Sequence, residues 1–182
     1  GHPLRVIVTS RSDPGLRTLQ AIAPDGTRVL AEVHHLGGSP WAQWIEIPAP
    51  VNGRYTVALG DGPSVTACDT VTVARFEPAP EPRDDRFAAV WEPRWHWEAD
   101  TEALFAAWVE QLFLYPVGDD RTWTSLSEIL QDREHNLLFD HLAMDEDVPA
   151  DRTLPPAERH AYELVPDCAD LPFFLRAYLS WK

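Results

Sequence analysis

The sequence is poor in the residues that most often reveal a function. Its 182 residues include one lysine, one methionine and two cysteines. Two cysteines a hundred positions apart exclude a disulfide framework and a cysteine-based zinc site. A single Cys68–Cys168 bridge remains open in an oxidising compartment. No apolar run reaches the roughly 18 residues that a membrane-spanning helix needs, so we predict no membrane span.

Positive charge is also scarce. The formal net charge is −14 and the sequence pI is about 4.7. A surface of this sign repels phosphate backbones and the headgroups of anionic lipids. We therefore predict that the chain has no nucleic-acid partner.

Residues 1–75 carry an all-β pattern. Strands are expected over 5–9, 18–23, 27–33, 41–47, 55–59 and 65–73. Pro24-Asp25-Gly26 predicts a hairpin turn, because proline presets φ and glycine accepts a positive φ. Asp69 would fall on the apolar face of the last strand, so we expect a β-bulge at 68–70. Six short strands at regular spacing predict an immunoglobulin-like β-sandwich, with a small barrel as the alternative.

The composition changes after the strands. Residues 76–90 are rich in proline and mixed charge, which predicts an extended linker. Residues 91–182 then show helical periodicity. The expected fold class is therefore α+β, with a β-sandwich domain at 1–75 followed by a mainly helical region at 91–182.

Helix signals can be placed within the second region. Asp100 is the expected N-cap of a first helix that ends at Pro116. Ser125 and Glu128 form a capping box for a second helix. Leucines at 137, 138 and 142 predict its continuation or a further short helix. The acidic stretch 145–162 is expected to be a solvated loop.

Residues 165–182 hold the strongest candidate for chemistry, the thiol of Cys168. The apolar spacing predicts a helix just after this residue, and a helix N-terminus favours the nucleophilic thiolate. Asp167 and Asp170 oppose this effect through their negative charge. Pro172 fits the first turn if Asp170 is the N-cap, so we expect Cys168 in the turn before the helix. The alternative is a buried structural cysteine.

Asp167-Cys168-Ala169-Asp170, followed by an apolar-aromatic helix, resembles the D-C-S-G motif of the NlpC/P60 cysteine peptidases. These enzymes belong to the papain-like superfamily and cleave peptide bonds in bacterial cell walls. The resemblance implies that Cys168 is the nucleophile and that a histidine on a later strand is the base. Ala169-Asp170 departs from the Ser-Gly pair of that family.

The resemblance also implies a setting for the chain. A β-domain ahead of the catalytic part is common in that family. Residues 91–182 would then be the truncated start of a papain-like domain, in the N-terminal part of an extracytoplasmic cell-wall hydrolase. Its substrate would be peptidoglycan or a peptide, and the strands that carry the base would follow Lys182.

A histidine upstream of Cys168 is the other possible base, because permuted papain-like relatives carry the histidine first. We take His141, on a short amphipathic stretch, as the candidate. His135 and His160 are further possibilities. For each of them the alternative is a surface histidine or a hydrogen-bonded core histidine, and geometry decides between these.

Metal and cofactor binding are not predicted. His34 and His35 are adjacent, and neighbours on a strand point to opposite faces. The carboxylates at 145–147 lack the spacing and the glycine of a calcium loop.

A non-catalytic role is the second hypothesis. Trp91, Trp95 and Trp97 follow the linker, and their rings could stack on sugars or anchor one domain on another. In this hypothesis the β-domain binds a protein or a glycan, the helices form a scaffold, and Cys168 is buried. In either hypothesis the last apolar helix needs a partner surface. We expect it on residues 101–142, on a missing part of the chain or on another subunit.

Overall fold

A computed structural model of the chain describes residues 2–61, 64–74, 97–142, 147 and 164–182. The chain divides into two compact units, Gly1–Glu77 and Pro78–Lys182. Strands form the first unit, and helices and turns form the second, so the predicted α+β class is confirmed. The expected linker at 76–90 lies outside the described residues.

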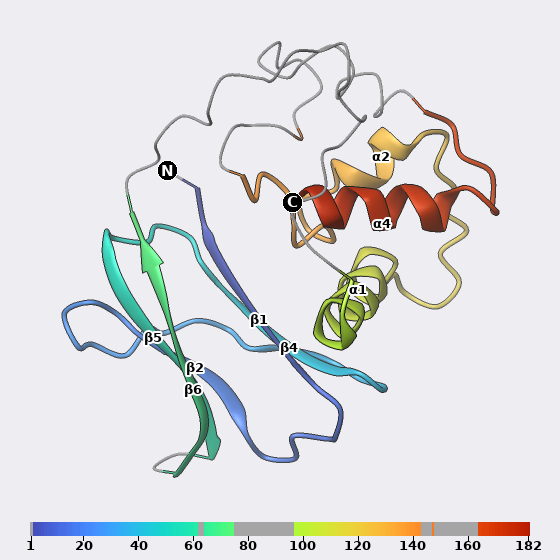
Figure 1. Cartoon of the computed structure of the whole chain (residues 1–182). Coiled ribbons are helices and arrows are strands. Elements are labelled where there is room, and N and C mark those ends of the chain that lie inside the picture. The colour runs from blue at the N-terminus through green and yellow to red at the C-terminus, as the bar shows by residue number, and fades with distance from the viewer. Residues whose placement is uncertain (1, 62–63, 75–96, 143–146, 148–163) are drawn as a thin grey trace. The chain divides into compact units, whose positions relative to one another are not determined.

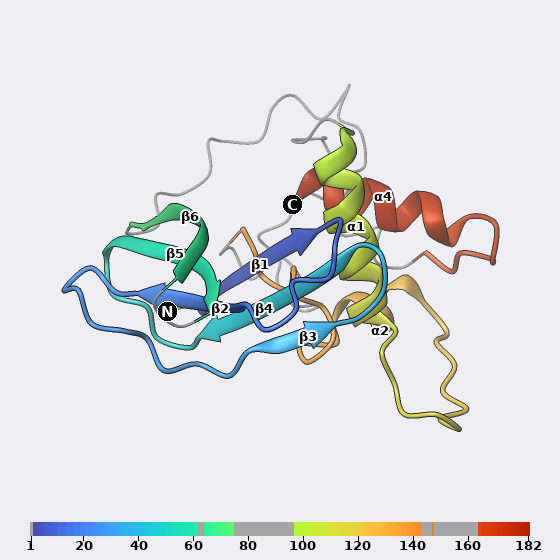
Figure 2. The same cartoon turned by 90° about the horizontal axis from the view of Figure 1, so that it is seen from below.

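The first unit has six strands among its described residues, and they form two antiparallel sheets (Figure 1). They are β1 (Leu4–Ser10), β2 (Thr18–Ile22), β3 (His34–Leu36), β4 (Trp41–Ile47), β5 (Gly53–Asp61) and β6 (Ser64–Val73). One sheet has the order β1-β4-β3, which Figure 2 shows side by side, and the other has the order β2-β5-β6.

Both sheets contribute to one hydrophobic core. Its buried members are Val6, Ile45 and Ile47 from the first sheet, with Leu19, Ala21, Tyr55 and Val57 from the second. Tyr55 and Val57 on β5 are buried, as the alternation predicts, but farther along this strand Ala58 is buried and Leu59 is half-buried. The turn at Gly26, with a φ of 85°, is also confirmed.

The predicted strand at 27–33 is wrong. This segment makes one isolated bridge, between Ile22 and Arg28, and the next strand is β3. The bridge continues from β2 in one sheet, whereas β3 pairs with β4 in the other. A segment that passes from one sheet to the other cannot keep one ladder. Val29, Ala31 and Val33 nevertheless pack against the core.

The β-bulge also lies elsewhere than predicted. Pairing of β5 with β6 shifts register between Leu59 and Gly60, where Thr66 is the extra residue. The ladder is continuous past 68–70, and Asp69 pairs with Val57. Because β6 is at the edge of its sheet, Asp69 stays exposed without a bulge.

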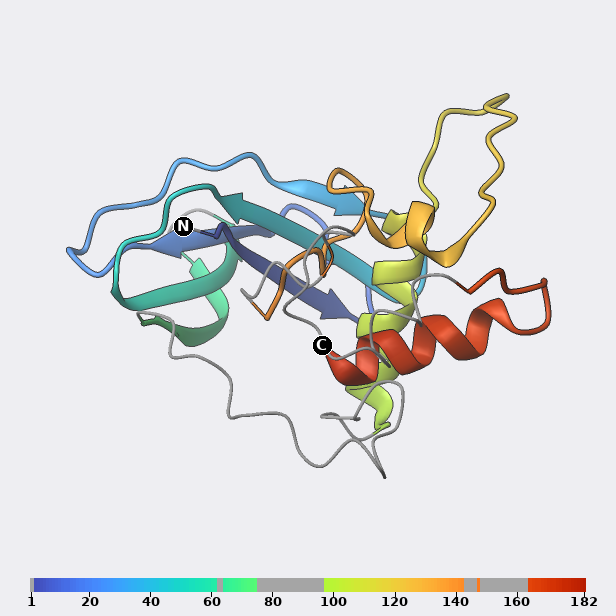
Figure 3. The ribbon, with the colours of Figure 1, turned by 90° about the horizontal axis from the view of Figure 1, so that it is seen from above.

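The second unit contains α1 (Ala99–Leu112), α2 (Leu126–Leu130) and α4 (Leu171–Trp181). Figure 3 shows α4 lying across α1. The rings of Trp108 and Tyr178 stack with centroids 5.6 Å apart, and both side chains are fully buried. The expectation that the last helix packs on residues 101–142 is therefore confirmed. None of the described helices is long and apolar enough to cross a membrane.

Two helix predictions need correction. The residue that precedes α1 is Glu98, so Asp100 lies in the first turn, where its charge suits the helix dipole. Residues 137–142 form turns and no helix, because Asp140 adopts a φ of 51°. The predicted capping of α2 is confirmed: the Ser125 hydroxyl accepts from the Glu128 N–H at 3.3 Å.

Candidate functional site

Cys168 is exposed in the turn that leads into α4. The N–H of Leu171 donates to the carbonyl of Asp167 at 3.0 Å, which is a helical hydrogen bond. The Asp167 carboxylate accepts the N–H groups of Ala169 and Asp170, at 2.7 and 2.9 Å. These are the bonds of an N-cap residue. Cys168 is thus the first residue of a capped helical turn.

Pro172 lies in the first turn of α4, and the helix is preceded by Asp170, both as predicted. The Asp170 side chain makes no capping hydrogen bond, and its φ and ψ of −83° and −32° are already helical. The capping hydrogen bonds are made by Asp167 instead, in the turn that holds Cys168. Pro172 cannot donate to the carbonyl of Cys168, and Phe173 donates instead to the carbonyl of Asp170, three residues back, at 3.0 Å.

The half of α4 next to Cys168 is attached to α1 by Arg176. Its guanidinium makes two hydrogen bonds to the Glu102 carboxylate, at 2.6 and 2.8 Å. It also lies 4.5 Å from the ring centroid of Trp97 and 4.6 Å from that of Phe105. The hydrogen bond from Arg176 holds the pKa of Glu102 below its ordinary value. Charge and stacking together orient this helix.

The other half of α4 is held by Asn136, whose side chain has no solvent exposure. The Asn136 amide oxygen accepts from Trp108 Nε1 and from the Leu138 N–H, both at 3.0 Å. The Asn136 amide nitrogen donates to the Leu130 carbonyl at 2.6 Å and to the Tyr178 hydroxyl at 3.0 Å. One side chain therefore links α1, the end of α2 and α4. The only sequence signal for this role is a polar residue beside an apolar run.

The acidic loop is not solvated at the one residue of 145–147 that the structure describes. Asp147 is 1% exposed. Its carboxylate accepts from the Tyr178 hydroxyl at 2.8 Å and from the Asp140 N–H at 2.7 Å, and it pairs with the Lys182 ammonium. The prediction of a solvated loop is wrong here because a buried carboxylate is tolerated when paired and hydrogen-bonded.

Cys168 and His141 lie at opposite ends of α4. Asp140, the neighbour of His141, binds Asp147, and Asp147 pairs with Lys182 at the C-terminal end of this helix. Cys168 is at the N-terminal end, and 11 residues of helix span about 16 Å. The described residues therefore do not form a Cys168–His141 pair. His160 lies outside the described residues.

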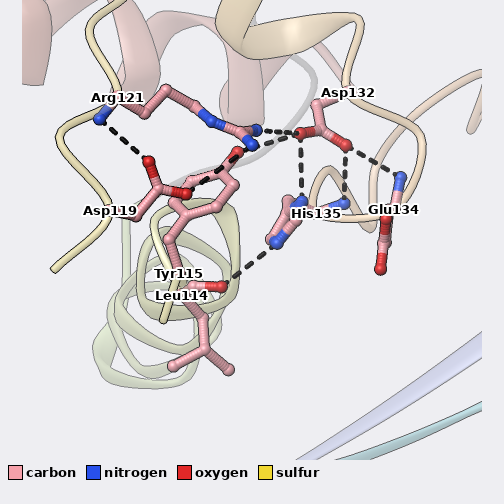
Figure 4. A network of polar contacts seen from close by, with 7 residues as sticks. All are labelled: Leu114, Tyr115, Asp119, Arg121, Asp132, Glu134 and His135. Atoms are coloured by element: carbon pink, nitrogen blue, oxygen red, sulfur yellow. Dashed lines mark hydrogen bonds and ion pairs between the residues drawn. The ribbon is translucent and has the colours of Figure 1, made fainter. Parts of the chain in front are cut away.

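His135 belongs to a separate polar cluster (Figure 4). Its Nδ1 is 3.0 Å from Asp132 Oδ2, and its Nε2 is 3.1 Å from the carbonyl oxygen of Leu114. The Tyr115 hydroxyl donates to the same Asp132 oxygen at 2.8 Å. Since both ring nitrogens are engaged, His135 has no free nitrogen for proton transfer to a thiol.

The remaining sequence candidates are dispersed. His34 stacks on Trp44, with ring centroids 4.0 Å apart, while His35 is exposed. Across the described ranges, no three His, Cys, Asp or Glu side chains group in a way that could hold a metal ion. Trp97 is 40% exposed, and Trp91 and Trp95 lie outside the described residues.

No protein-family model matches the chain, and no curated protein matches its sequence. A functional proposal therefore depends on the geometry of the described residues and on the motif at Asp167–Asp170.

Proposed function

We propose that this chain is the N-terminal part of a bacterial cell-wall cysteine hydrolase similar to the NlpC/P60 peptidases, with Cys168 as nucleophile. In this proposal an immunoglobulin-like β-sandwich precedes the start of a papain-like domain. The protein acts outside the cytoplasm on peptidoglycan or a peptide.

The observation that carries the proposal is the position of the thiol. Cys168 is exposed and is the first residue of the turn that Asp167 caps. A nucleophilic cysteine needs access to its substrate and a nearby source of positive potential, and a helix N-terminus provides the second. Arg176 and Asn136 attach the helix to the core, so that the thiol is held in a defined place.

In this proposal the base is a histidine on a strand after Lys182, as the resemblance implies, since His135 and His141 do not meet Cys168. The chain by itself is then inactive, and Cys168 supplies half of an active site. The non-catalytic alternative is less well supported, because it expects a buried Cys168.

Thiol alkylation tests the proposal, and the chain provides its own control. Cys68 and Cys168 are both exposed, so a difference in rate reports reactivity rather than access. We expect iodoacetamide to label Cys168 several-fold faster than Cys68 at pH 7, measured in Cys68→Ser and Cys168→Ser variants of the complete protein. Equal rates at the two thiols would overturn the proposal.

Hydrolysis provides the second measurement. The complete protein is expected to release peptide fragments from purified peptidoglycan, and Cys168→Ser to release none, with Cys68→Ser as the matched control. Release that survives Cys168→Ser would assign the activity to another nucleophile.

A further inference from the structure

The cluster around His135 is used neither by the thiol nor by the buried core (Figure 4). The His135 side chain is 14% exposed, and each of its ring nitrogens faces one oxygen. Nδ1 faces Asp132 Oδ2 at 3.0 Å, and Nε2 faces the Leu114 carbonyl oxygen at 3.1 Å. Asp132 begins the turn after α2, and Leu114 follows the end of α1. The imidazole therefore bridges two elements.

Neither of the facing oxygens can donate a hydrogen bond. A peptide carbonyl and an ionised carboxylate only accept. The pKa of Asp132 lies below its ordinary value: burial, the largest influence, acts to raise it, but hydrogen bonds from Tyr115 and His135 outweigh burial. A neutral imidazole has one N–H and an imidazolium has two. Both bonds of His135 therefore exist together only in the imidazolium.

We propose that His135 is a proton-dependent clasp that joins the end of α1 to the turn after α2 by two hydrogen bonds when charged and by one when neutral. The bond to the charged carboxylate is the stronger and is the one retained. The neutral ring then turns the lone pair of Nε2 toward the Leu114 carbonyl, and that contact opens. Histidine is the side chain that ordinarily changes charge between pH 5 and 8.

Cations and hydroxyls near the ring keep Asp132 ionised when His135 is neutral. The Tyr115 hydroxyl donates to Asp132 Oδ2 at 2.8 Å, and the Tyr115 ring lies 4.1 Å from the imidazole. The Arg121 guanidinium is 3.8 Å from the same carboxylate oxygen and lies over the Tyr115 ring at 4.3 Å. When His135 is neutral, the Asp132 carboxylate therefore still has the Tyr115 hydroxyl as a hydrogen-bond donor and the Arg121 guanidinium as a nearby cation.

Other charged side chains also lie near the ring. Asp119 pairs with Arg121 at 3.7 Å and so draws part of its charge away from Asp132. Glu134 is exposed next to His135, and its backbone N–H donates to Asp132 Oδ1 at 3.1 Å. Arg133, the remaining neighbour with charge, lies over the Phe139 ring.

The segment after α1 is the part that the clasp controls. Phe113 and Tyr115 both pack on Trp123. The ring centroid of Phe113 lies 5.3 Å from that of Trp123, and the ring centroid of Tyr115 lies 5.5 Å from it. Leu114 lies between Phe113 and Tyr115, so its carbonyl contact to His135 fastens this aromatic group to the turn at Asp132. Opening that contact should expose the backbone of 113–123 to exchange with solvent.

Histidine-ring ¹⁵N NMR on the full chain tests the clasp directly. We expect both His135 ring nitrogens to carry protons at pH 5.5 and only Nδ1 at pH 8. Amide exchange in 113–123, corrected for the intrinsic effect of pH, should become several-fold faster at pH 8. A single protonated ring nitrogen at pH 5.5, or exchange that does not change with pH, would overturn the proposal.

Matched histidine variants assign the effect to this residue. His135→Gln should abolish the pH dependence of exchange in 113–123, whereas His35→Gln, at an exposed histidine on β3, should leave it intact. Equal pH dependence in both variants would contradict the clasp. If His135→Gln does not fold, the ring spectrum of the unaltered chain still decides.

Discussion

Buried polar side chains dominate the helical unit at the scale of single residues. Asn136 makes four hydrogen bonds without solvent exposure, and Asp147 pairs with the chain's only lysine, Lys182. An unsatisfied polar group in a core costs about 1–3 kcal/mol. Few arrangements of the helices give these buried side chains all their hydrogen bonds, so the side chains favour one packing of α1 and α4.

Asn136→Ala should be strongly destabilising. It removes the partner of Trp108 Nε1, of the Leu130 carbonyl and of the Leu138 N–H. The expected loss is about 3 kcal/mol in the free energy of unfolding of the helical unit. Denaturant titration followed by helical circular dichroism measures it. Glu110→Ala, on the exposed side of α1, is the control and should change stability by less than about 0.5 kcal/mol.

The Lys182–Asp147 pair should behave non-additively. Lys182→Met leaves a buried carboxylate without its cation and should cost about 3 kcal/mol. Adding Asp147→Asn removes that charge, so the double variant should lose clearly less than the sum of the two single losses. A double-mutant cycle in urea measures the coupling, and simple additivity would mean that the pair is not a unit.

Gly60→Ala tests the register shift in the β5–β6 hairpin. An added Cβ would lie 2.3 Å from the Ser64 carbonyl oxygen, so the backbone must move. We expect a loss of about 1–3 kcal/mol in the free energy of unfolding. Gly37→Ala is the matched control, because nothing lies within 4 Å of its added Cβ. Thermal unfolding measures the loss. A similar fall in the thermal midpoint for both substitutions would contradict the close contact with Ser64 as its cause.

Element boundaries follow local capping wherever the partners are near in sequence. Ser125 caps α2 as the sequence predicts, since the hydroxyl and the N–H it binds are three residues apart. The start of α4 was harder to predict, because Asp167 and Asp170 are both suitable residues. The structure gives the side-chain capping bonds to Asp167, whereas Asp170 directly precedes the helix and Pro172 lies in its first turn.

Two aspartate variants separate these roles. Asp167→Ala should cost about 1 kcal/mol in the free energy of unfolding, because it removes the acceptor of two backbone N–H groups. Asp170→Ala should cost little, since that side chain makes no capping bond. Amide exchange at 168–171 locates the loss. Equal exchange in the two variants would contradict the assignment.

The failures at this scale concern segments whose partners are distant in sequence. Residues 27–33 have the alternation of a strand, yet they pass between the sheets and make one bridge. Residues 137–142 have the apolar spacing of a helix, but Asp140 takes a positive φ where its backbone meets Asp147. Periodicity reports which side chains face the core and does not report which backbone group each residue pairs with.

At the scale of the whole molecule, the chain combines a net charge of −14 with carboxylates that the fold uses as hydrogen-bond acceptors. A carboxylate loses its role as an ionised acceptor when it is protonated in acid. The unfolded chain then binds more protons than the folded chain, so stability falls as the pH falls. That phosphate backbones and anionic lipids are unfavourable partners for such a charge stays a prediction.

Asp132→Asn should reveal this linkage. The pKa of Asp132 is lowered in the folded chain: burial acts to raise it, but the hydrogen bonds from Tyr115 and His135 prevail. A lowered pKa contributes stability that is present above the unfolded value of about 3.9 and is lost as the pH falls through the folded pKa. The gap in urea midpoint between the two chains should shrink as the pH falls below 4. A gap that is unchanged down to pH 2 would contradict this.

The amino-acid sequence by itself determined the α+β class, five of the six strands, the capped start of α2 and the apolar helix that follows Cys168. These features depend on periodicity and on contacts between near neighbours. The sequence also singled out Cys168, because a cysteine before an apolar helix is a local pattern. Only the tertiary structure decided the burial of Asp147 and the separation of His141 from Cys168. Those depend on groups far apart in the chain, whose pairing follows from packing.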